Sequence, residues 1–191
     1  MPNKNIPLIV VNVGINTGSG EMCDEFGPSK HNPTEVLYVL KYVNLVSHFL
    51  EQKERLERTE SSSKAQPNPY HSDTNDHVDN IGIIAPYKKQ IQKIREFLKE
   101  MNAPKCRVGS VEEYQGQERK AIILSTVRSR IVNNQDCENI GFLHSEKRFN
   151  VAITRAQSLL IVISSVESLS VVPCWKKFFE FAKENGCIIN V

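Results

Sequence analysis

Two apolar runs in the second half of the chain constrain the fold more than any other sequence feature. The runs cover Ala121 to Val127 and Ser158 to Ser164, and aliphatic and β-branched residues dominate both. Continuous apolar runs of this length are typical of strands that are buried on both faces of a parallel sheet. The sequence therefore predicts an α/β fold with a mainly parallel sheet flanked by helices, in which ligands bind at strand and loop ends.

Shorter signals predict the remaining elements. Further strands are expected over 6–13, 81–85, 106–109 and 188–191, and helices are expected from 33 to about 58, from 87 to about 101, from 146 and from 173. Asn32 is placed to cap the first helix, and Glu35 is placed to reach back to that cap. Trp175 and the aromatic residues after it recur at helical spacing and are expected in the core. A length of 191 residues suits a single domain, 1–191.

Composition and cysteine spacing exclude several classes of protein. An apolar share of 40% and a charged share of 24% are ordinary for a globular domain. No apolar run is long enough to span a membrane and no signal peptide follows Met1, so a cytoplasmic protein is expected. The five cysteines lie far apart without a Cys-x-x-Cys pair, so neither disulfides nor a metal site is expected. The polar segment 59–80 is predicted to be a flexible surface insertion, with an accessory binding loop as the alternative.

A net charge of +2 conceals an uneven distribution of charge along the chain. Residues 17–80 hold six Lys and Arg against eleven Asp and Glu, whereas residues 81–130 hold eleven against five. A basic segment suits a phosphate-rich partner, because Lys and Arg near phosphates release condensed counterions. The alternative is that these cations lie on solvated helix faces.

Three polar segments next to the predicted strands carry the functional signal. Ser110 to Glu118 reads SVEEYQGQE, Arg148 to Ala156 reads RFNVAITRA, and Gly82 to Gln90 reads GIIAPYKKQ. In this order they resemble motifs V, VI and IV of the superfamily 1 RNA and DNA helicases. Within this family, the chain is most similar to the Armitage-like RNA-silencing helicases, in the sequence EYQGQER and in the segment Trp175 to Gly186.

The resemblance implies a RecA-like, P-loop NTPase-type domain, namely the second motor domain of such a helicase. Arg155 matches the motif VI arginine that reaches the γ-phosphate of ATP as an arginine finger. The other residues implied at the nucleotide are Gly116, Gln117, Glu118 and Arg148. The residues implied at RNA are Pro86, Tyr87, Lys88, Ser110, Gln115, Asn150 and Thr154. For Ser110 and Thr154 the alternative is capping or local backbone bonding, and for Tyr114 base stacking and core packing both stay open.

The sequence has no Walker A loop and no Asp-Glu metal-binding motif. The resemblance therefore implies that a first RecA-like domain of the same polypeptide supplies the Walker lysine and the Mg²⁺ ligands, and that this chain alone is inactive. It also implies single-stranded RNA as partner, 5′ to 3′ translocation, RNA-silencing proteins as further partners, and a place in the cytoplasm or in ribonucleoprotein granules. A non-catalytic nucleic-acid-binding module and a DNA helicase remain the alternatives.

Overall fold

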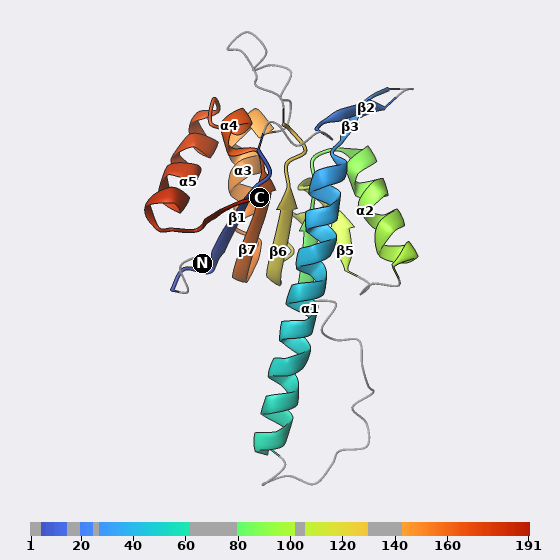
Figure 1. The fold of residues 1–191 in the computed structure, drawn as a ribbon, viewed down its shortest axis with the longest axis vertical. Coiled ribbons are helices and arrows are strands. Elements are labelled where there is room, and N and C mark those ends of the chain that lie inside the picture. Colours follow the sequence, from blue (N-terminus) through green and yellow to red (C-terminus); the bar gives the residue numbers. More distant parts are fainter. Residues whose placement is uncertain (1–4, 15–19, 25–26, 62–79, 102–105, 130–142) are drawn as a thin grey trace.

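The computed structural model describes residues 5–14, 20–24, 27–61, 80–101, 106–129 and 143–191. Six parallel strands form the central sheet in the order β5-β4-β6-β7-β1-β8 (Figure 1). The strands are β1 (Leu8–Asn12), β4 (Ile81–Ile84), β5 (Arg107–Gly109), β6 (Arg119–Ser125), β7 (Ala156–Ser164) and β8 (Ile188–Asn190). The predicted α/β fold with a parallel sheet is confirmed, and the C-terminal strand is an edge strand.

Helices cover both faces of the sheet. The helices are α1 (Pro33–Ser61), α2 (Lys88–Glu100), α3 (Glu146–Ile153), α4 (Val166–Leu169) and α5 (Pro173–Glu184). Helices α1 and α2 pack in one apolar core and α3 to α5 in the other. Ile122 belongs to the second core and its neighbour Ile123 to the first, which explains why β6 is continuously apolar from Ala121 to Leu124. Among the described helices, none has both the length and the apolar character needed to cross a membrane.

A two-stranded antiparallel ribbon, β2 (Met22–Asp24) and β3 (Gly27–His31), was not anticipated from the sequence. It extends from the sheet edge at which the strands end (Figure 1). At the other edge, the C-terminal half of α1 projects beyond the sheet. The segment predicted as an insertion begins as helix, because α1 continues through residues 59–61; residues 62–79 lie outside the described residues.

The start of α1 differs from the expected capping box. Asn32 caps the helix, since its Oδ1 accepts a hydrogen bond from Glu35 N at 3.2 Å. The Glu35 carboxylate does not reach back to Asn32, so that part of the prediction was wrong. Instead Glu35 accepts hydrogen bonds from Ser125 Oγ at 2.6 Å and from Val127 N at 2.8 Å, at the end of β6. A tertiary contact has replaced the local one.

The aromatic residues of α5 are core residues, as predicted. Trp175 is 1% exposed and its Nε1 donates to Leu143 O at 3.0 Å. Its ring meets Phe149 of α3 edge to face, with ring centroids 4.9 Å apart. These contacts fix α3 against α5 and therefore fix the position at which α3 ends.

Tyr114 is buried in the core, which excludes base stacking for its ring. It ends the short 3₁₀ helix η2 (Glu112–Tyr114), and its hydroxyl accepts from Ile83 N at 3.1 Å and donates to Arg107 O at 2.6 Å. The hydroxyl thus joins β4 to β5. Burial raises the pKa of Tyr114 to about 12. A Cβ on Gly82 would lie 2.8 Å from the same hydroxyl oxygen, so Gly82 leaves the space that Tyr114 occupies.

Tyr114→Phe is expected to destabilise the chain by about 1–3 kcal/mol, because the buried Ile83 N–H loses its acceptor and Arg107 O loses its donor. Urea unfolding of the chain measures the change in free energy of unfolding. Tyr38→Phe on α1 is the matched control, since Tyr38 is only partly buried, and a change within about 0.5 kcal/mol is expected there. Equal effects of the two substitutions would contradict the role given to the Tyr114 hydroxyl.

Candidate nucleotide and nucleic-acid sites

The candidate site residues lie on two opposite edges of the sheet. All six strands run in one direction, so residues that follow strands meet at the carboxyl edge and residues that precede strands meet at the amino edge. Tyr87 and Lys88 follow β4, and Ser110 follows β5, which places them at the carboxyl edge. Glu118 precedes β6 and Arg155 precedes β7, which places them at the amino edge.

Hydrogen bonds gather the amino-edge residues into one cluster, termed here the Arg155 cluster and consisting of Gln117, Glu118, Arg155 and Gln157. Gln157 Nε2 donates to Glu118 Oε2 at 3.2 Å. Arg119 N donates to Arg155 O at 3.0 Å, and Arg119 Nη2 donates to Gln117 Oε1 at 3.4 Å. Adjacent strands β6 and β7 therefore bring together residues of two motifs that are distant in sequence.

The Arg155 guanidinium lies against the C-terminal end of α3. Its Nε donates to Val151 O at 3.1 Å and its Nη2 donates to Thr154 Oγ1 at 3.0 Å. Helix C-termini carry a partial negative charge that attracts a cation. Thr154 Oγ1 itself donates to Asn150 O at 2.8 Å. Thr154, which the resemblance implied at RNA, thus lies beside Arg155, and its local bonding matches the alternative that the sequence left open.

Two more candidate residues, Gln115 and Gly116, lie in the connection from β5 to β6, which starts at Ser110 on the carboxyl edge. Ser110 Oγ accepts from Glu113 N at 3.4 Å, and Gln115 is exposed. Gly116 adopts a φ of +73° with open space around its Cα, so the left-handed backbone, and not close packing, favours glycine there. Arg148 is joined to this connection by an ion pair of 2.9 Å from its Nε to Glu112 Oε1.

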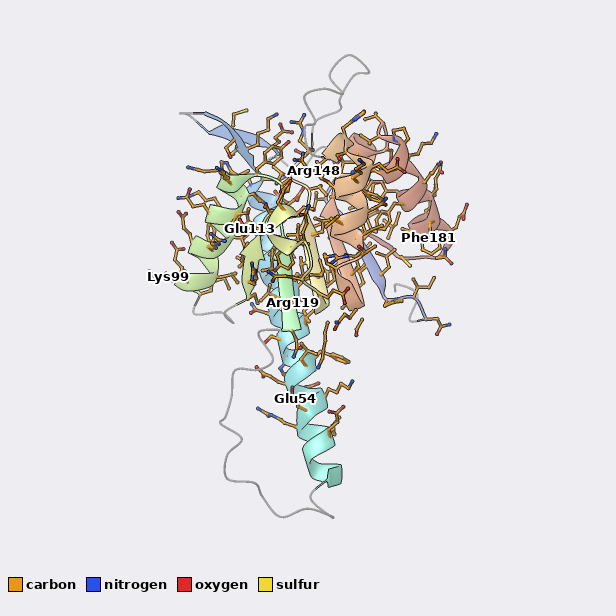
Figure 2. The ribbon with its side chains drawn as sticks, turned by 180° about the vertical axis from the view of Figure 1, so that it is seen from behind. Glu54, Lys99, Glu113, Arg119, Arg148 and Phe181 are labelled. Carbon is orange, nitrogen blue, oxygen red and sulfur yellow. The ribbon has the colours of Figure 1, made fainter. Side chains whose placement is uncertain are left out.

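Arg148 therefore stands apart from the Arg155 cluster. It lies in the first turn of α3, whereas Arg155 follows the last turn, about 10 Å further along the helix axis at 1.5 Å per residue. Figure 2 shows Arg148 toward one edge of the sheet and Arg119 toward the other. Asn150 is exposed on α3 and lies between Arg148 and Arg155 along the helix.

A buried ionic cluster at the carboxyl edge was not anticipated from the sequence. Arg128 Nη1 forms an ion pair of 3.2 Å with Glu21 Oε1, and both side chains are nearly fully buried. Lys30 of β3 pairs with the same Glu21 oxygen. Arg128 also hydrogen-bonds the Tyr87 side chain, whose pKa is raised mainly by burial. The loop after β6 and the β2–β3 ribbon thus hold Tyr87 in place. An arginine directly after a buried strand is the only sequence signal for this cluster.

A second buried polar network surrounds Glu35. Beside its bonds to Ser125 and Val127, its Oε1 accepts from Thr126 Oγ1 at 3.5 Å. Gln90 of α2 completes the network by donating to Ser125 Oγ at 2.9 Å. Burial raises the pKa of the Glu35 carboxyl to about 7. Val127 adopts a φ of +72°, which is rare for a β-branched residue, and the Glu35 bond to Val127 N helps to hold this conformation.

Among the residues that the structure describes, no three His, Cys, Asp or Glu side chains gather into a group that could hold a metal ion. Two glutamates of the connection from β5 to β6 illustrate this. Glu118 is bonded to Gln157, and Glu112 is paired with Arg148. The described donors therefore do not fit Mg²⁺ on their own.

The fold defines the class: the chain is an α/β domain of the RecA-like type, with helices on both faces of a parallel sheet. A sequence model of the AAA domain family AAA_12 matches residues 1–167, and the chain belongs to this family. It is 38% identical over 187 residues to RNA helicase Mov10l1 of Homo sapiens, which covers 97% of this chain and 13% of the relative. It is 34% identical over 196 residues to putative helicase MOV-10 of Gallus gallus. That match covers 97% of this chain and 18% of the relative.

A third relative is the probable RNA helicase armi of Drosophila melanogaster, 39% identical over 111 residues, which cover 57% of this chain and 9% of the relative. The resemblance to Armitage-like helicases is confirmed, and homology identifies a helicase domain. The chain spans less than a fifth of the length of each of these three relatives.

Proposed function

We propose that the chain is the C-terminal motor domain of an ATP-dependent superfamily 1 RNA helicase. The observation that carries the proposal is the Arg155 cluster: an arginine, a carboxylate and two amides gather at the amino edge of the sheet. Tyr87 and Lys88 lie at the opposite edge. Nucleotide and RNA would thus contact opposite edges of one domain. The connection from Ser110 to Glu118 runs between the edges and is anchored midway by buried Tyr114.

Phosphoryl transfer requires that negative charge on the transferred group be stabilised, and an arginine from a neighbouring domain supplies that charge. Arg155 is suited to this role because its planar fork can donate two hydrogen bonds to phosphate oxygens. Gln117, Glu118 and Gly116 would line the same side of the nucleotide. A first RecA-like domain of the same polypeptide would hold ATP and Mg²⁺, for which the described residues supply no ligand set.

The carboxyl edge offers contacts that bind a strand without reading its sequence. Lys88 is exposed in the first turn of α2, where the positive end of the helix dipole also favours phosphate. Pro86, Tyr87, Ser110 and Gln115 would contact the sugar and phosphate groups of single-stranded RNA. Closure of two motor domains around ATP, and their reopening after hydrolysis, would move the strand. The names of two of the relatives support RNA as the substrate. The proposal further includes 5′ to 3′ movement, a role in RNA silencing, and a place in the cytoplasm or in ribonucleoprotein granules, which rest on the motif resemblance alone.

Unwinding of duplex RNA and of duplex DNA of the same sequence, by the full-length polypeptide with ATP, tests this function. We expect ATP-dependent unwinding of RNA that exceeds unwinding of DNA by about tenfold or more, because 2′-hydroxyl groups distinguish the two strands. Omission of ATP is the control. Preferential unwinding of DNA would favour a DNA helicase. RNA binding without unwinding or RNA-stimulated hydrolysis would favour a non-catalytic module.

A further inference from the structure

A basic groove runs beside the outer face of α2, on the side of the sheet where β5 is the outermost strand. Its volume is about 490 Å³, and it is open to solvent. Its charged lining residues are Lys88, Arg95, Glu96, Lys99 and Glu113. Helix α2 as a whole carries two acidic residues against five cations, Lys88, Lys89, Lys93, Arg95 and Lys99. This surface is termed the α2 groove.

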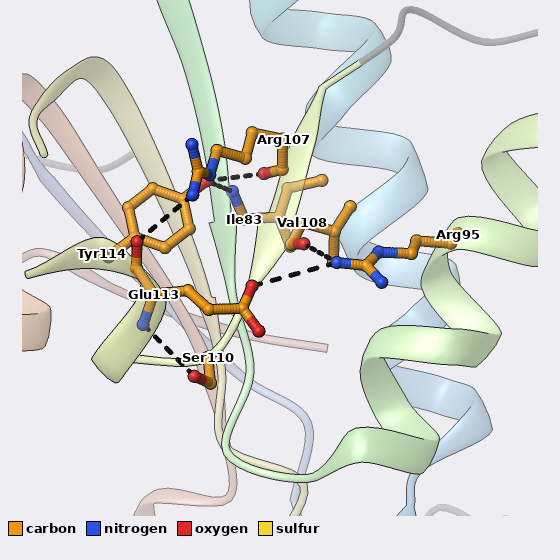
Figure 3. A network of polar contacts seen from close by, with 7 residues as sticks. All are labelled: Ile83, Arg95, Arg107, Val108, Ser110, Glu113 and Tyr114. Atoms are coloured by element: carbon orange, nitrogen blue, oxygen red, sulfur yellow. Dashed lines mark hydrogen bonds and ion pairs between the residues drawn. The ribbon is translucent and has the colours of Figure 1, made fainter.

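The carboxylates of the α2 groove already have partners. Arg95 reaches across from α2, where its Nη2 donates to Val108 O and lies 4.0 Å from Glu113 Oε2 (Figure 3). Glu96 Oε2 accepts from Lys93 Nζ at 3.0 Å, and this bond is the main cause of its lowered pKa. The negative charges in the groove are therefore offset, while Lys88 and Lys99 present exposed ammonium groups at its two ends.

The position of the groove links it to the proposed RNA-binding edge. Lys88 belongs both to the groove and to the carboxyl-edge residues proposed above. Lys99 lies eleven positions further along the same helix, about 16 Å away at 1.5 Å per residue. Ile91 contributes an apolar wall between them. A row of cations that starts at Lys88 and leads away from the carboxyl edge matches the repeated charge of a nucleic-acid backbone.

We propose that the α2 groove binds the phosphodiester backbone of single-stranded RNA as a continuation of the strand bound at Lys88. The inference rests on the proposed function, because the strand must first lie at the carboxyl edge. It adds a site, and it names Lys99 as the residue at the far end. An acidic protein segment is a different occupant; continuity with Lys88 favours RNA.

Binding of an RNA length series to the full-length polypeptide tests this inference. The RNAs are extended one nucleotide at a time from the 5′ end or from the 3′ end. Lys99→Glu is expected to leave the affinity for the shortest binding RNA unchanged. It is expected to abolish the gain in affinity from the nucleotides added at one end, a loss of at least about fivefold in 0.1 M salt, because each lost phosphate contact removes about 0.7 from the slope of log affinity against log salt.

Lys183→Glu is the matched control. Lys183 is the exposed cation in the last turn of α5, as Lys99 is in the last turn of α2, so both substitutions remove the same favourable helix-end charge. Lys183→Glu is expected to bind RNA of every length as the wild type does. Lys99→Ala, which adds no negative charge, should show the same length dependence with a smaller loss.

The outcomes separate the inference from the function on which it rests. Equal binding of wild type and Lys99→Glu at every RNA length overturns the inference, including the case in which an acidic protein segment occupies the groove. An equal loss at every length, the shortest included, also overturns it, since Lys99 would then act on the whole fold. A wild type that binds no RNA and shows no RNA-stimulated hydrolysis overturns the proposed function itself.

Discussion

Arg155→Ala is expected to lower RNA-stimulated ATP turnover of the full-length polypeptide by about 10³, the lower end of what arginine fingers contribute. The reason is that the guanidinium would stabilise the charge that develops on the transferred phosphoryl group, whereas the neighbouring Arg119 is already bonded to Gln117 Oε1 and Glu118 O. RNA binding should be retained, because Arg155 lies at the amino edge of the sheet, away from Tyr87 and Lys88. Steady-state hydrolysis at saturating RNA measures the first effect and equilibrium binding measures the second.

Two further variants sharpen this prediction. Arg155→Lys keeps the positive charge but loses the planar fork, so a loss intermediate between wild type and Arg155→Ala is expected. Arg55→Ala removes an exposed arginine from the projecting half of α1 and should leave turnover as in the wild type. Unchanged turnover in Arg155→Ala would mean that the domain has kept its fold for binding alone, and the phosphoryl-transfer role would be abandoned.

The second large effect is a dependence of stability on pH that originates at Glu35. Its folded-state pKa is raised from 4.5 to about 7 by burial. A raised pKa means that the folded chain binds the proton more tightly than the unfolded chain, so the contribution of Glu35 is fully present below pH 4.5 and is lost as pH rises through 7. The full shift corresponds to about 3 kcal/mol at 1.36 kcal/mol per pKa unit.

Glu35→Gln is expected to remove this contribution, because the amide keeps the shape of the neutral carboxyl and does not ionise. The free energy of unfolding is measured in urea at pH 5 and pH 8. Its fall between these two pH values should be smaller in the variant than in the wild type, by about 2.5 kcal/mol. Glu51→Gln removes an exposed carboxylate from the same helix and controls for a change in net charge. Parallel pH profiles of wild type and Glu35→Gln would refute the assignment.

The central sheet was predictable from sequence because its long strands each contain a continuous apolar run, such as Ala121 to Leu124 in β6 and Leu159 to Ile163 in β7, and the helices between strands carry a clear period. The β2–β3 ribbon was not predictable. It contains Gly27 and Pro28 and lacks an alternating pattern, and Glu21 beside it is fixed by an ion pair with Arg128, which lies far away in sequence. Glu35 shows the same limit: a local rule predicted a bond to the helix cap, but the end of β6 offered three donors to its buried carboxylate.

The candidate site was predictable as a set of residues but not as an arrangement. Gln117, Glu118 and Arg155 come together only because β6 and β7 are adjacent in the sheet, and strand order cannot be derived from the motifs alone. Arg148 and Arg155 lie in one motif, yet they lie at opposite ends of α3, and Arg148 is paired with Glu112. Residues of one motif were therefore predicted to bind the same ligand, although the fold places them apart.

The position of β1 has a consequence for how the chain is synthesised. Leu8 pairs with Leu160 of β7, and Val10 pairs with Ile188 of β8, so the earliest strand is completed by the latest ones. At ribosomal rates of about 5–20 residues per second, β1 would wait on the order of ten seconds or longer for its neighbours to emerge. During that interval an apolar strand with two unpaired edges stays exposed on the nascent chain. A chaperone that covers exposed apolar strands would therefore act on this domain before its sheet can close.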